Sequence, residues 1–237
     1  MNRLNSAELP TRLDRAVREL CPLIEDRVDA QIPDEWTEYR LRIEFIDCLL
    51  GSQVRSETAS AWTSSLERAG LLDDGWWSGI QNANFATIVL DVLSGRGADA
   101  TPRGRYRFYN VRAKQIAQAR DALARTPLSA RLLDGGAPQQ LRRSLVADLP
   151  GIGPKQASML LRNTGVTYEL AIIDTHVLRF LELLGLTPRG YATAETMRGY
   201  ESMERVLVAY ADMVGYAVGY VDWAIWITMK AARGLGQ

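Results

Sequence analysis

Hydrophobic residues along the 237-residue chain recur mostly at intervals of three and four, the spacing of one face of an α-helix. The alternating pattern typical of a strand is almost absent. Stretches rich in glycine or proline interrupt the helical pattern at residues 31–33, 51, 70–79, 94–104, 135–138, 165 and 185–190. The pattern therefore predicts an all-α protein, without internal repeats or a long linker.

One of these interruptions is typical of a tight turn between two helices. Residues 139–148 have helical spacing, Gly151 and Gly153 can form the turn, and Pro154 suits the first position of the next helix. Lys155 would then lie in the first helical turn. Free amide N–H groups and the positive end of the helix dipole favour an anion there, such as a DNA phosphate, and disfavour a charged ammonium.

Lys155 is unusual in this chain, because only three of its 28 basic residues are lysines. An arginine stays protonated near neutral pH, whereas a lysine can lose its proton and act as a nucleophile. Lys155 is therefore a candidate nucleophile. The alternative is a solvated lysine in an ordinary helical hairpin.

Asp174 follows the apolar pair Ile172 and Ile173 and precedes a helical pattern that runs through Leu184. An aspartate before a helix is a favoured N-cap, worth about 1 kcal/mol, and capping alone would explain this residue. Together with Lys155, its carboxylate can also stabilise a developing cationic sugar and accept the proton of the amine. The two residues favour nucleophilic cleavage at an anomeric carbon.

These motifs resemble those of the helix-hairpin-helix DNA glycosylase superfamily. Residues 149–158 (LPGIGPKQAS) are similar to its hairpin, and residues 173–176 (IDTH) are similar to its catalytic aspartate motif. Residues 161–165 (LRNTG) and 222–226 (DWAIW) look like the archaeal and bacterial type of 8-oxoguanine DNA glycosylase/AP lyase. The resemblance covers residues 40–232 and is strong between 141 and 184.

The resemblance implies a single glycosylase unit, residues 1–237, with two helical lobes and a DNA-binding cleft between them. Residues 1–40 and 185–237 would form the terminal lobe. Residues 41–184 would form the central region, which contains the hairpin at 141–164.

The resemblance also implies roles for particular residues. Lys155 would form a Schiff base with the sugar, and Asp174 would be the essential carboxylate. Gly151 and Gly153 would bind the DNA backbone, and Gln53 would fill the gap left by the extruded base.

Three further residues are candidates for DNA or base contact. Asp222 and Trp226, four residues apart on one helical face, resemble residues that hold the extruded base, although packing of the last helix is the alternative. His176, the only histidine, is either a DNA contact or a polar group near the cap.

The formal net charge is zero, so any nucleic-acid site must be a local basic patch. Residues 100–120 contain six basic residues and no acidic one, interleaved with aromatic residues. The basic members are Arg103, Arg105, Arg107, Arg112, Lys114 and Arg120, and we take Arg107, Arg112 and Lys114 as DNA contacts. A solvated loop and helix face is the alternative. Arg142 and Arg143, before the hairpin, are further candidates.

Cys21 and Cys48 are the only cysteines and do not form a CxxC pair, so the sequence predicts no metal site and no iron-sulfur cluster, which needs four thiolates. The resemblance implies no organic cofactor but allows a monovalent cation at the hairpin carbonyls. Residues 1–14 lack an apolar signal region, and Asp222 interrupts the apolar stretch 213–229. We expect a cytoplasmic monomer that associates with the nucleoid and not with a membrane.

The expected function is a bifunctional DNA N-glycosylase/AP lyase acting on double-stranded DNA. It would flip out and excise a damaged or modified base, first of all 8-oxoguanine, through a lysine Schiff base and then cleave the strand by β-elimination. One alternative is the same chemistry on another base, such as a glucosylated phage cytosine in antiviral defence. A second is a non-catalytic helix-hairpin-helix module, which needs the glycines but neither Lys155 nor Asp174.

Overall fold

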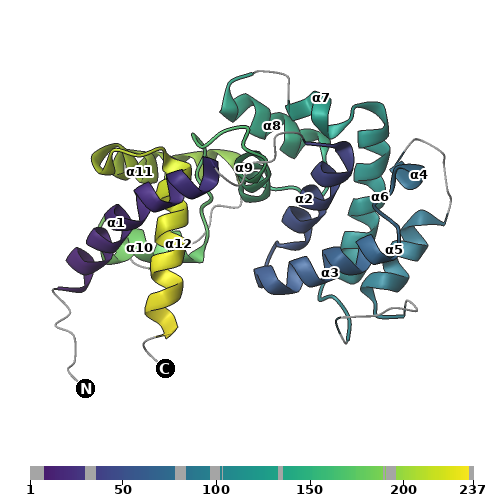
Figure 1. The fold of residues 1–237 in the computed structure, drawn as a ribbon, viewed down its shortest axis with the longest axis horizontal. Coiled ribbons are helices and arrows are strands. Elements are labelled where there is room, and N and C mark those ends of the chain that lie inside the picture. The colour runs from purple at the N-terminus through teal and green to yellow at the C-terminus, as the bar shows by residue number, and fades with distance from the viewer. Residues whose placement is uncertain are drawn as a thin grey trace. The chain divides into compact units, whose positions relative to one another are not determined.

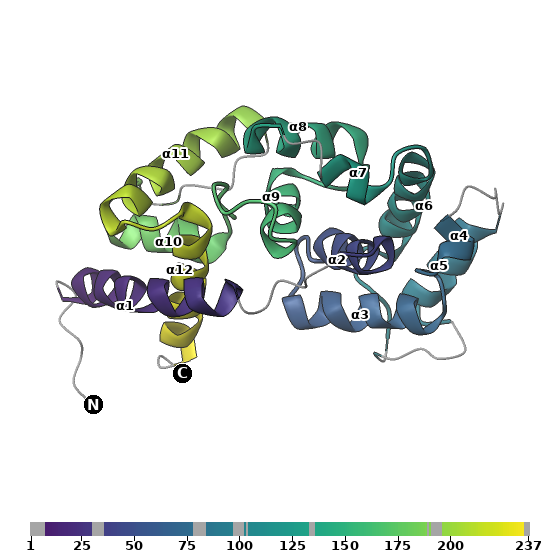
Figure 2. The ribbon, with the colours of Figure 1, turned by 45° about the horizontal axis from the view of Figure 1, so that its top comes forward.

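The computed structural model describes residues 8–29, 36–77, 84–96, 102, 104–132, 136–188, 190 and 196–234. These residues form twelve helices, joined by turns and loops, and contain no strand (Figures 1 and 2). The all-α prediction is confirmed. Among the described helices, none has an apolar stretch of the length that a bilayer crossing requires.

The chain divides into two compact units. The first comprises the described residues of Met1–Pro33 and Thr167–Gln237, and the second those of Asp34–Val166. The terminal unit therefore resumes at Thr167, whereas we expected residue 185. The physical reason is that the helix after Asp174 buries Val177, Phe180 and Leu181 in the core formed with the terminal helices.

The first unit contains four helices: α1 (Leu9–Asp29), α10 (Thr175–Leu183), α11 (Met197–Val214) and α12 (Val218–Gly234). Helix α12 packs against the other three, and α1 crosses it (Figures 1 and 2). Helix α1 buries residues at intervals of three and four, namely Leu13, Val17, Cys21, Ile24 and Val28. This apolar face supplies one side of the core.

The second unit contains the remaining helices: α2 (Glu38–Leu50), α3 (Ser56–Arg68), α4 (Asp74–Trp77), α5 (Phe85–Leu93), α6 (Tyr109–Arg125), α7 (Leu128–Leu132), α8 (Pro138–Asp148) and α9 (Pro154–Asn163). Helix α2 is central and contacts α3, α6, α7 and α9, while α8 and α9 pack against each other. The helix that carries Lys155 is thus supported by both α2 and α8.

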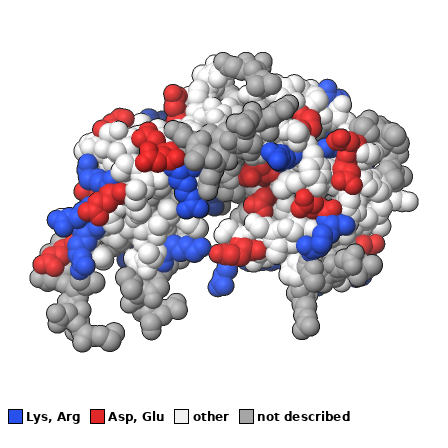
Figure 3. Space-filling model, in the orientation of Figure 1, with Lys and Arg blue, Asp and Glu red and all other residues white. Residues whose placement is uncertain are grey.

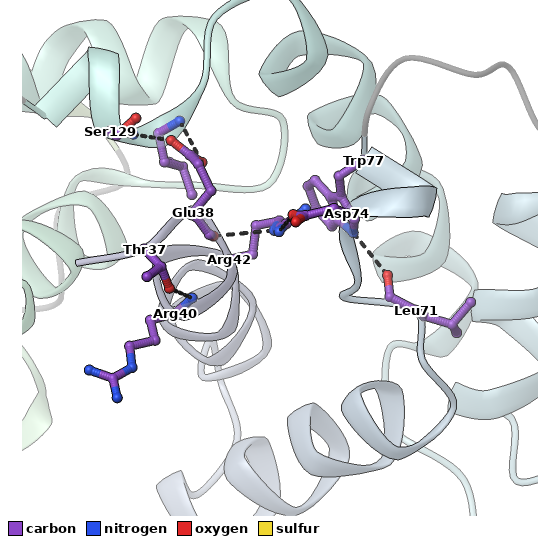
Figure 4. A network of polar contacts seen from close by, with 9 residues as sticks. Thr37, Glu38, Arg40, Arg42, Leu71, Asp74, Trp77 and Ser129 are labelled. Atoms are coloured by element: carbon purple, nitrogen blue, oxygen red, sulfur yellow. Dashed lines mark hydrogen bonds and ion pairs between the residues drawn. The ribbon is translucent and has the colours of Figure 1, made fainter. Parts of the chain in front are cut away.

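A polar network at the start of α2 connects this helix to α4 and α7 (Figure 4). The Glu38 carboxylate accepts the N–H of Leu128 at 3.3 Å and that of Ser129 at 2.7 Å, at the N-terminus of α7. The buried Arg42 donates to the Glu38 carbonyl at 3.2 Å and pairs with Asp74 at the start of α4. Carboxylates at helix N-termini are electrostatically favourable, so these contacts stabilise the arrangement of all three helices.

Candidate functional site

The hairpin has the form that its glycines predict. Helix α8 ends at Asp148, the Ile152 N–H donates to the Leu149 carbonyl at 3.2 Å, and α9 begins at Pro154. Gly151 has φ +88°, the left-handed conformation that glycine adopts without strain. Lys155 is half-buried and is the second residue of α9, so it lies in the first helical turn as the sequence predicted.

Helix α6 packs directly against this turn. Arg112 donates from Nη1 to the Gly151 carbonyl at 3.2 Å and to Oε1 of Gln115 at 2.7 Å. A Cβ atom at Gly151 would lie 2.7 Å from Cδ and Oε1 of Gln115 and 3.2 Å from Nη1 of Arg112. The turn therefore requires glycine both for its backbone conformation and for the close approach of α6.

The hairpin is also linked from within. Arg142 on α8 is 0% exposed and donates to the Ser158 hydroxyl of α9 at 3.2 Å. Its guanidinium therefore connects the two hairpin helices in the interior, whereas the sequence suggested a phosphate contact. Arg143, the next residue, is exposed.

The predicted basic patch divides into two groups. Arg105, Arg107 and Lys114 are exposed, Arg112 and Arg120 are buried, and Arg103 lies outside the described residues. The Arg107 guanidinium lies 4.8 Å from the Phe108 ring centroid, and the Arg120 guanidinium lies 4.5 Å from that of Phe85. Over each unit, basic and acidic side chains are interspersed on the face drawn in Figure 3. The exposed members remain candidates for phosphate contact, while Arg112 and Arg120 contact protein.

Gln53 has an unusual backbone conformation. It is exposed in the turn between α2 and α3 and is the one non-glycine residue among those described with a positive φ, of 60°. The last carbonyl of α2, at Leu50, accepts a 2.6 Å hydrogen bond from the buried Tyr106 hydroxyl. Sparsely populated backbone conformations are retained where the surroundings stabilise them, and they are frequent at functional sites.

Asp174 caps α10 as the sequence predicted. Its Oδ1 accepts the N–H of His176 at 2.8 Å and that of Val177 at 2.9 Å. The side chain is half-buried, and the backbone is extended, with φ −115° and ψ −176°. Two amide hydrogen bonds to one oxygen restrict the orientation of this carboxylate.

The three residues before Asp174 each donate their backbone N–H to a side chain from another helix. Ala171 donates to Oε1 of Glu204 at 2.9 Å, Ile172 to Oδ2 of Asp222 at 2.6 Å, and Ile173 to the Tyr200 hydroxyl at 3.0 Å. The Tyr200 hydroxyl in turn donates to the Ala171 carbonyl at 2.9 Å. The approach to Asp174 is thus hydrogen-bonded to both α11 and α12.

Sequence reasoning missed two members of this set. Tyr200 and Glu204 lie one turn apart on the buried face of α11. The available signal in the sequence was their helical spacing with the apolar residues of that face, which predicts buried polar side chains. Asp222 was predicted to contact the base. In the structure it is 2% exposed and bonds the backbone of Ile172.

The other predicted residues of the terminal unit lie close to one another. The rings of His176 and Trp226 are 6.4 Å apart in an edge-to-face arrangement, and the Lys230 ammonium lies 4.5 Å from the Trp226 centroid. The structure therefore brings together the start of α10 and one face of α12. Lys155, by contrast, belongs to the second unit and Asp174 to the first.

The described residues contain no group of three or more histidine, cysteine, aspartate or glutamate side chains that could bind a metal ion. Cys21 and Cys48 are both buried and free. Burial raises the pKa of the Cys21 thiol to about 11, and burial together with the neighbouring Glu44 also raises that of Cys48.

A hairpin with a lysine in the first turn of its second helix, together with a capping aspartate, defines a helix-hairpin-helix protein of the DNA glycosylase type. The family model Ogg-HhH, described as 8-oxoguanine DNA glycosylase, matches residues 98–216, half of the chain and including both motifs. The chain belongs to this family.

Relatives and solved structures agree with this assignment. The chain is 36% identical over 128 residues to the 8-oxoguanine DNA glycosylase/AP lyase of Saccharolobus islandicus, covering 52% of this chain but only 58% of the relative. It is 29% identical over 228 residues to the protein of the same name from Thermotoga petrophila, covering 94% of this chain and 97% of the relative.

Among solved structures, the 8-oxoguanine DNA glycosylase of Thermotoga maritima matches with a TM-score of 0.66 and 28% identity, covering 94% of this chain and 96% of that one. The glycosylase/lyase of Methanocaldococcus jannaschii, in complex with DNA containing 8-oxoguanine, has the same fold, with a TM-score of 0.70 and 22% identity over 91% of this chain and 95% of that one.

Proposed function

We propose that the protein is a bifunctional DNA N-glycosylase and AP lyase that excises 8-oxoguanine from duplex DNA. The observation that carries the proposal is the amine of Lys155 in the first turn of α9, directly after a hairpin turn that α6 supports. Alignment with the Thermotoga petrophila relative over nearly its whole length supports the assignment.

DNA binding would begin at the hairpin. The backbone N–H groups near Gly151 and Gly153 would bind a phosphate at the start of α9, because the helix N-terminus favours anions. The exposed Arg107 and Lys114 would add phosphate contacts from α6 and the loop before it. Arg112 would act indirectly, through its hydrogen bond to the Gly151 carbonyl.

The target nucleotide would then leave the base stack. Gln53, already in a left-handed backbone conformation at an exposed turn, would fill the gap in the duplex. His176 would contact the DNA, and Trp226 would provide the plane on which the extruded base stacks. Asp222 would act on this base pocket indirectly, by fixing the Ile172 backbone.

The chemistry would use one nucleophile and one carboxylate. Nζ of Lys155 attacks C1′ of the sugar while the glycosidic bond breaks and its electron pair leaves with the base. The Asp174 carboxylate stabilises the positive charge that develops on the sugar and accepts the proton released by the amine. The nitrogen lone pair then opens the sugar ring by breaking the C1′–O4′ bond, and O4′ takes up a proton as the Schiff base forms. The Schiff base acidifies the C2′ proton, whose loss expels the 3′ phosphate by β-elimination.

This chemistry requires no organic cofactor. A monovalent cation at the carbonyls of the hairpin turn would add to phosphate binding without taking part in bond breaking. We further propose that the protein acts as a monomer in the cytoplasm, at the nucleoid. Sedimentation of the purified protein with and without duplex DNA would test the monomer.

Borohydride trapping tests the function. Purified protein is incubated with duplexes that carry 8-oxoguanine, another damaged base, glucosylated hydroxymethylcytosine or an abasic site. Sodium borohydride then reduces any Schiff base to a stable protein–DNA link. The 8-oxoguanine and abasic duplexes should each give a covalent band.

Matched variants assign the band to one amine. Lys155→Gln and Lys155→Arg should both abolish it, and the arginine variant does so while retaining the positive charge. Lys114→Arg, which changes an exposed lysine of α6 in the same way, should retain it. If the glucosylated duplex gives a band and the 8-oxoguanine duplex does not, the substrate is the alternative base. If the wild-type protein binds every duplex but traps none, including the abasic one, a non-catalytic DNA-binding module replaces this proposal.

A further inference from the structure

We propose that Tyr200, Glu204 and Asp222 are positioning residues, which set the orientation of the Asp174 carboxylate for base excision. This inference rests on the proposed function. It assigns a role to three buried polar side chains that do not themselves contact the substrate.

The segment that precedes Asp174 has an unusual hydrogen-bonding requirement. Residues 170–173 are buried, yet they are neither helical nor part of a sheet. Buried backbone N–H groups must be paired, since leaving one unsatisfied is strongly unfavourable. Here the side chains of Glu204, Asp222 and Tyr200 accept the N–H groups of three consecutive residues.

The geometry of these contacts favours a positioning role. The acceptors of the three N–H groups come from two helices, with Tyr200 and Glu204 on α11 and Asp222 on α12. The segment is therefore restrained from more than one side, immediately before the residue whose carboxylate must face the reacting sugar.

Tyr200 is the central member of the set. Its hydroxyl accepts the N–H of Ile173 and donates to the carbonyl of Ala171, so one side chain bridges two peptide groups. The peptide after Ile173 leads directly into Asp174. On the other side, the Asp174 Oδ1 accepts two N–H groups of α10, which leaves Oδ2 for the sugar. The carboxylate is thus restrained both through its backbone and through its side chain.

The expected loss of function is specific. A displacement of about 1 Å in a catalytic group can reduce a rate by about 100-fold without changing affinity. Tyr200→Phe removes the two bridging hydrogen bonds while retaining the ring. We expect it to lower the single-turnover rate of base release about 10- to 100-fold, with the Kd for the duplex unchanged within about twofold.

The chain provides a matched control on the same helix. Tyr210 is as buried as Tyr200, and its hydroxyl donates to Asp14 of α1 at 2.8 Å. Tyr210→Phe therefore also removes a tyrosine hydrogen bond between helices, but not one to the segment before Asp174. It should leave the rate of base release within about twofold of wild type even where both variants lose comparable stability.

A second pair of variants separates the hydrogen bond from simple packing. Glu204→Gln keeps an oxygen that can accept the Ala171 N–H, whereas Glu204→Ala removes the acceptor. We expect the glutamine variant to restore most of the rate that the alanine variant loses. Folding of every variant is checked by circular dichroism, and DNA binding is measured in the same buffer.

Two results would be decisive against the proposal. If Tyr200→Phe and Glu204→Ala release the base at the wild-type rate, the set has no positioning role, although the proposed function stands. If the wild-type protein gives no excision and no Lys155-dependent borohydride band, the proposed function fails and the positioning role fails with it. Borohydride trapping on a preformed abasic site distinguishes the cases, because it needs the Lys155 amine but no base release.

Discussion

Replacement of Gly151 by alanine should disrupt the hairpin turn through a backbone effect and a steric effect. At φ +88° an alanine is strained by about 1–2 kcal/mol. Its Cβ would also lie 2.7 Å from the Gln115 side chain. Gln115 can rotate away, but it then loses its hydrogen bond from Arg112, which is worth about 1 kcal/mol.

The loss of chain entropy in the unfolded state offsets about 0.4–1 kcal/mol of this penalty. We therefore expect Gly151→Ala to lower the free energy of unfolding of the second unit by about 2 kcal/mol. This corresponds to an increase of about 30-fold in the equilibrium constant for unfolding. The turn that presents the backbone N–H groups would also be distorted, so affinity for duplex DNA should fall.

Gly153→Ala is the matched control, two residues later in the same turn. Gly153 has φ −100° and ψ 177°, which any residue adopts. Among the described residues, a Cβ added there would meet only Oε1 of Gln156, at 3.0 Å. That side-chain end can shift. We expect this variant to remain within about 1 kcal/mol of wild type.

Urea denaturation followed by circular dichroism, together with fluorescence anisotropy of a labelled duplex, measures both effects. Because the two units can unfold separately, amide hydrogen exchange of α8 and α9 measures the free energy of unfolding of the hairpin itself. Equal stability and equal DNA affinity of the two alanine variants would refute the reasoning from the left-handed turn.

Two further predictions concern buried titratable groups. Burial raises the pKa of Glu44 above its ordinary 4.5, and hydrogen bonds from Asn163 and Cys48 oppose this effect only in part. Protonated Glu44 therefore stabilises the folded state, and this stabilisation is lost as the pH rises through the folded pKa. Glu44→Gln should therefore gain stability relative to wild type in urea titrations as the pH rises above 4.5. A stability difference that does not change with pH would contradict this. Because burial raises the pKa of Cys21 to about 11 and the residue is 0% exposed, a thiol reagent at about pH 8 should label it only as its unit unfolds; rapid labelling of the folded protein would show that the site is open.

Features that depend on neighbouring residues could be predicted from the sequence. The helical periodicity predicted an all-α protein, and the glycines, Pro154 and Asp174 located a turn, a helix start and an N-cap. These are local effects, because turn conformation and capping involve groups within a few residues of one another. The first-turn position of Lys155, on which the proposed chemistry depends, follows from the same local rules.

Features that depend on distant residues required the tertiary structure. Arg112 and Arg142 look like phosphate contacts in the sequence, yet packing turns both inward, one toward the Gly151 carbonyl and the other toward Ser158. The boundary at Thr167 depended on which core α10 joins. The segment before Asp174 is hydrogen-bonded to side chains 27 to 50 positions later in the chain. The sequence thus determined which residues form the turn and the cap and which are candidates for the reaction. Only the fold decided which polar groups meet, because buried donors bond to the acceptors that helix packing brings to them.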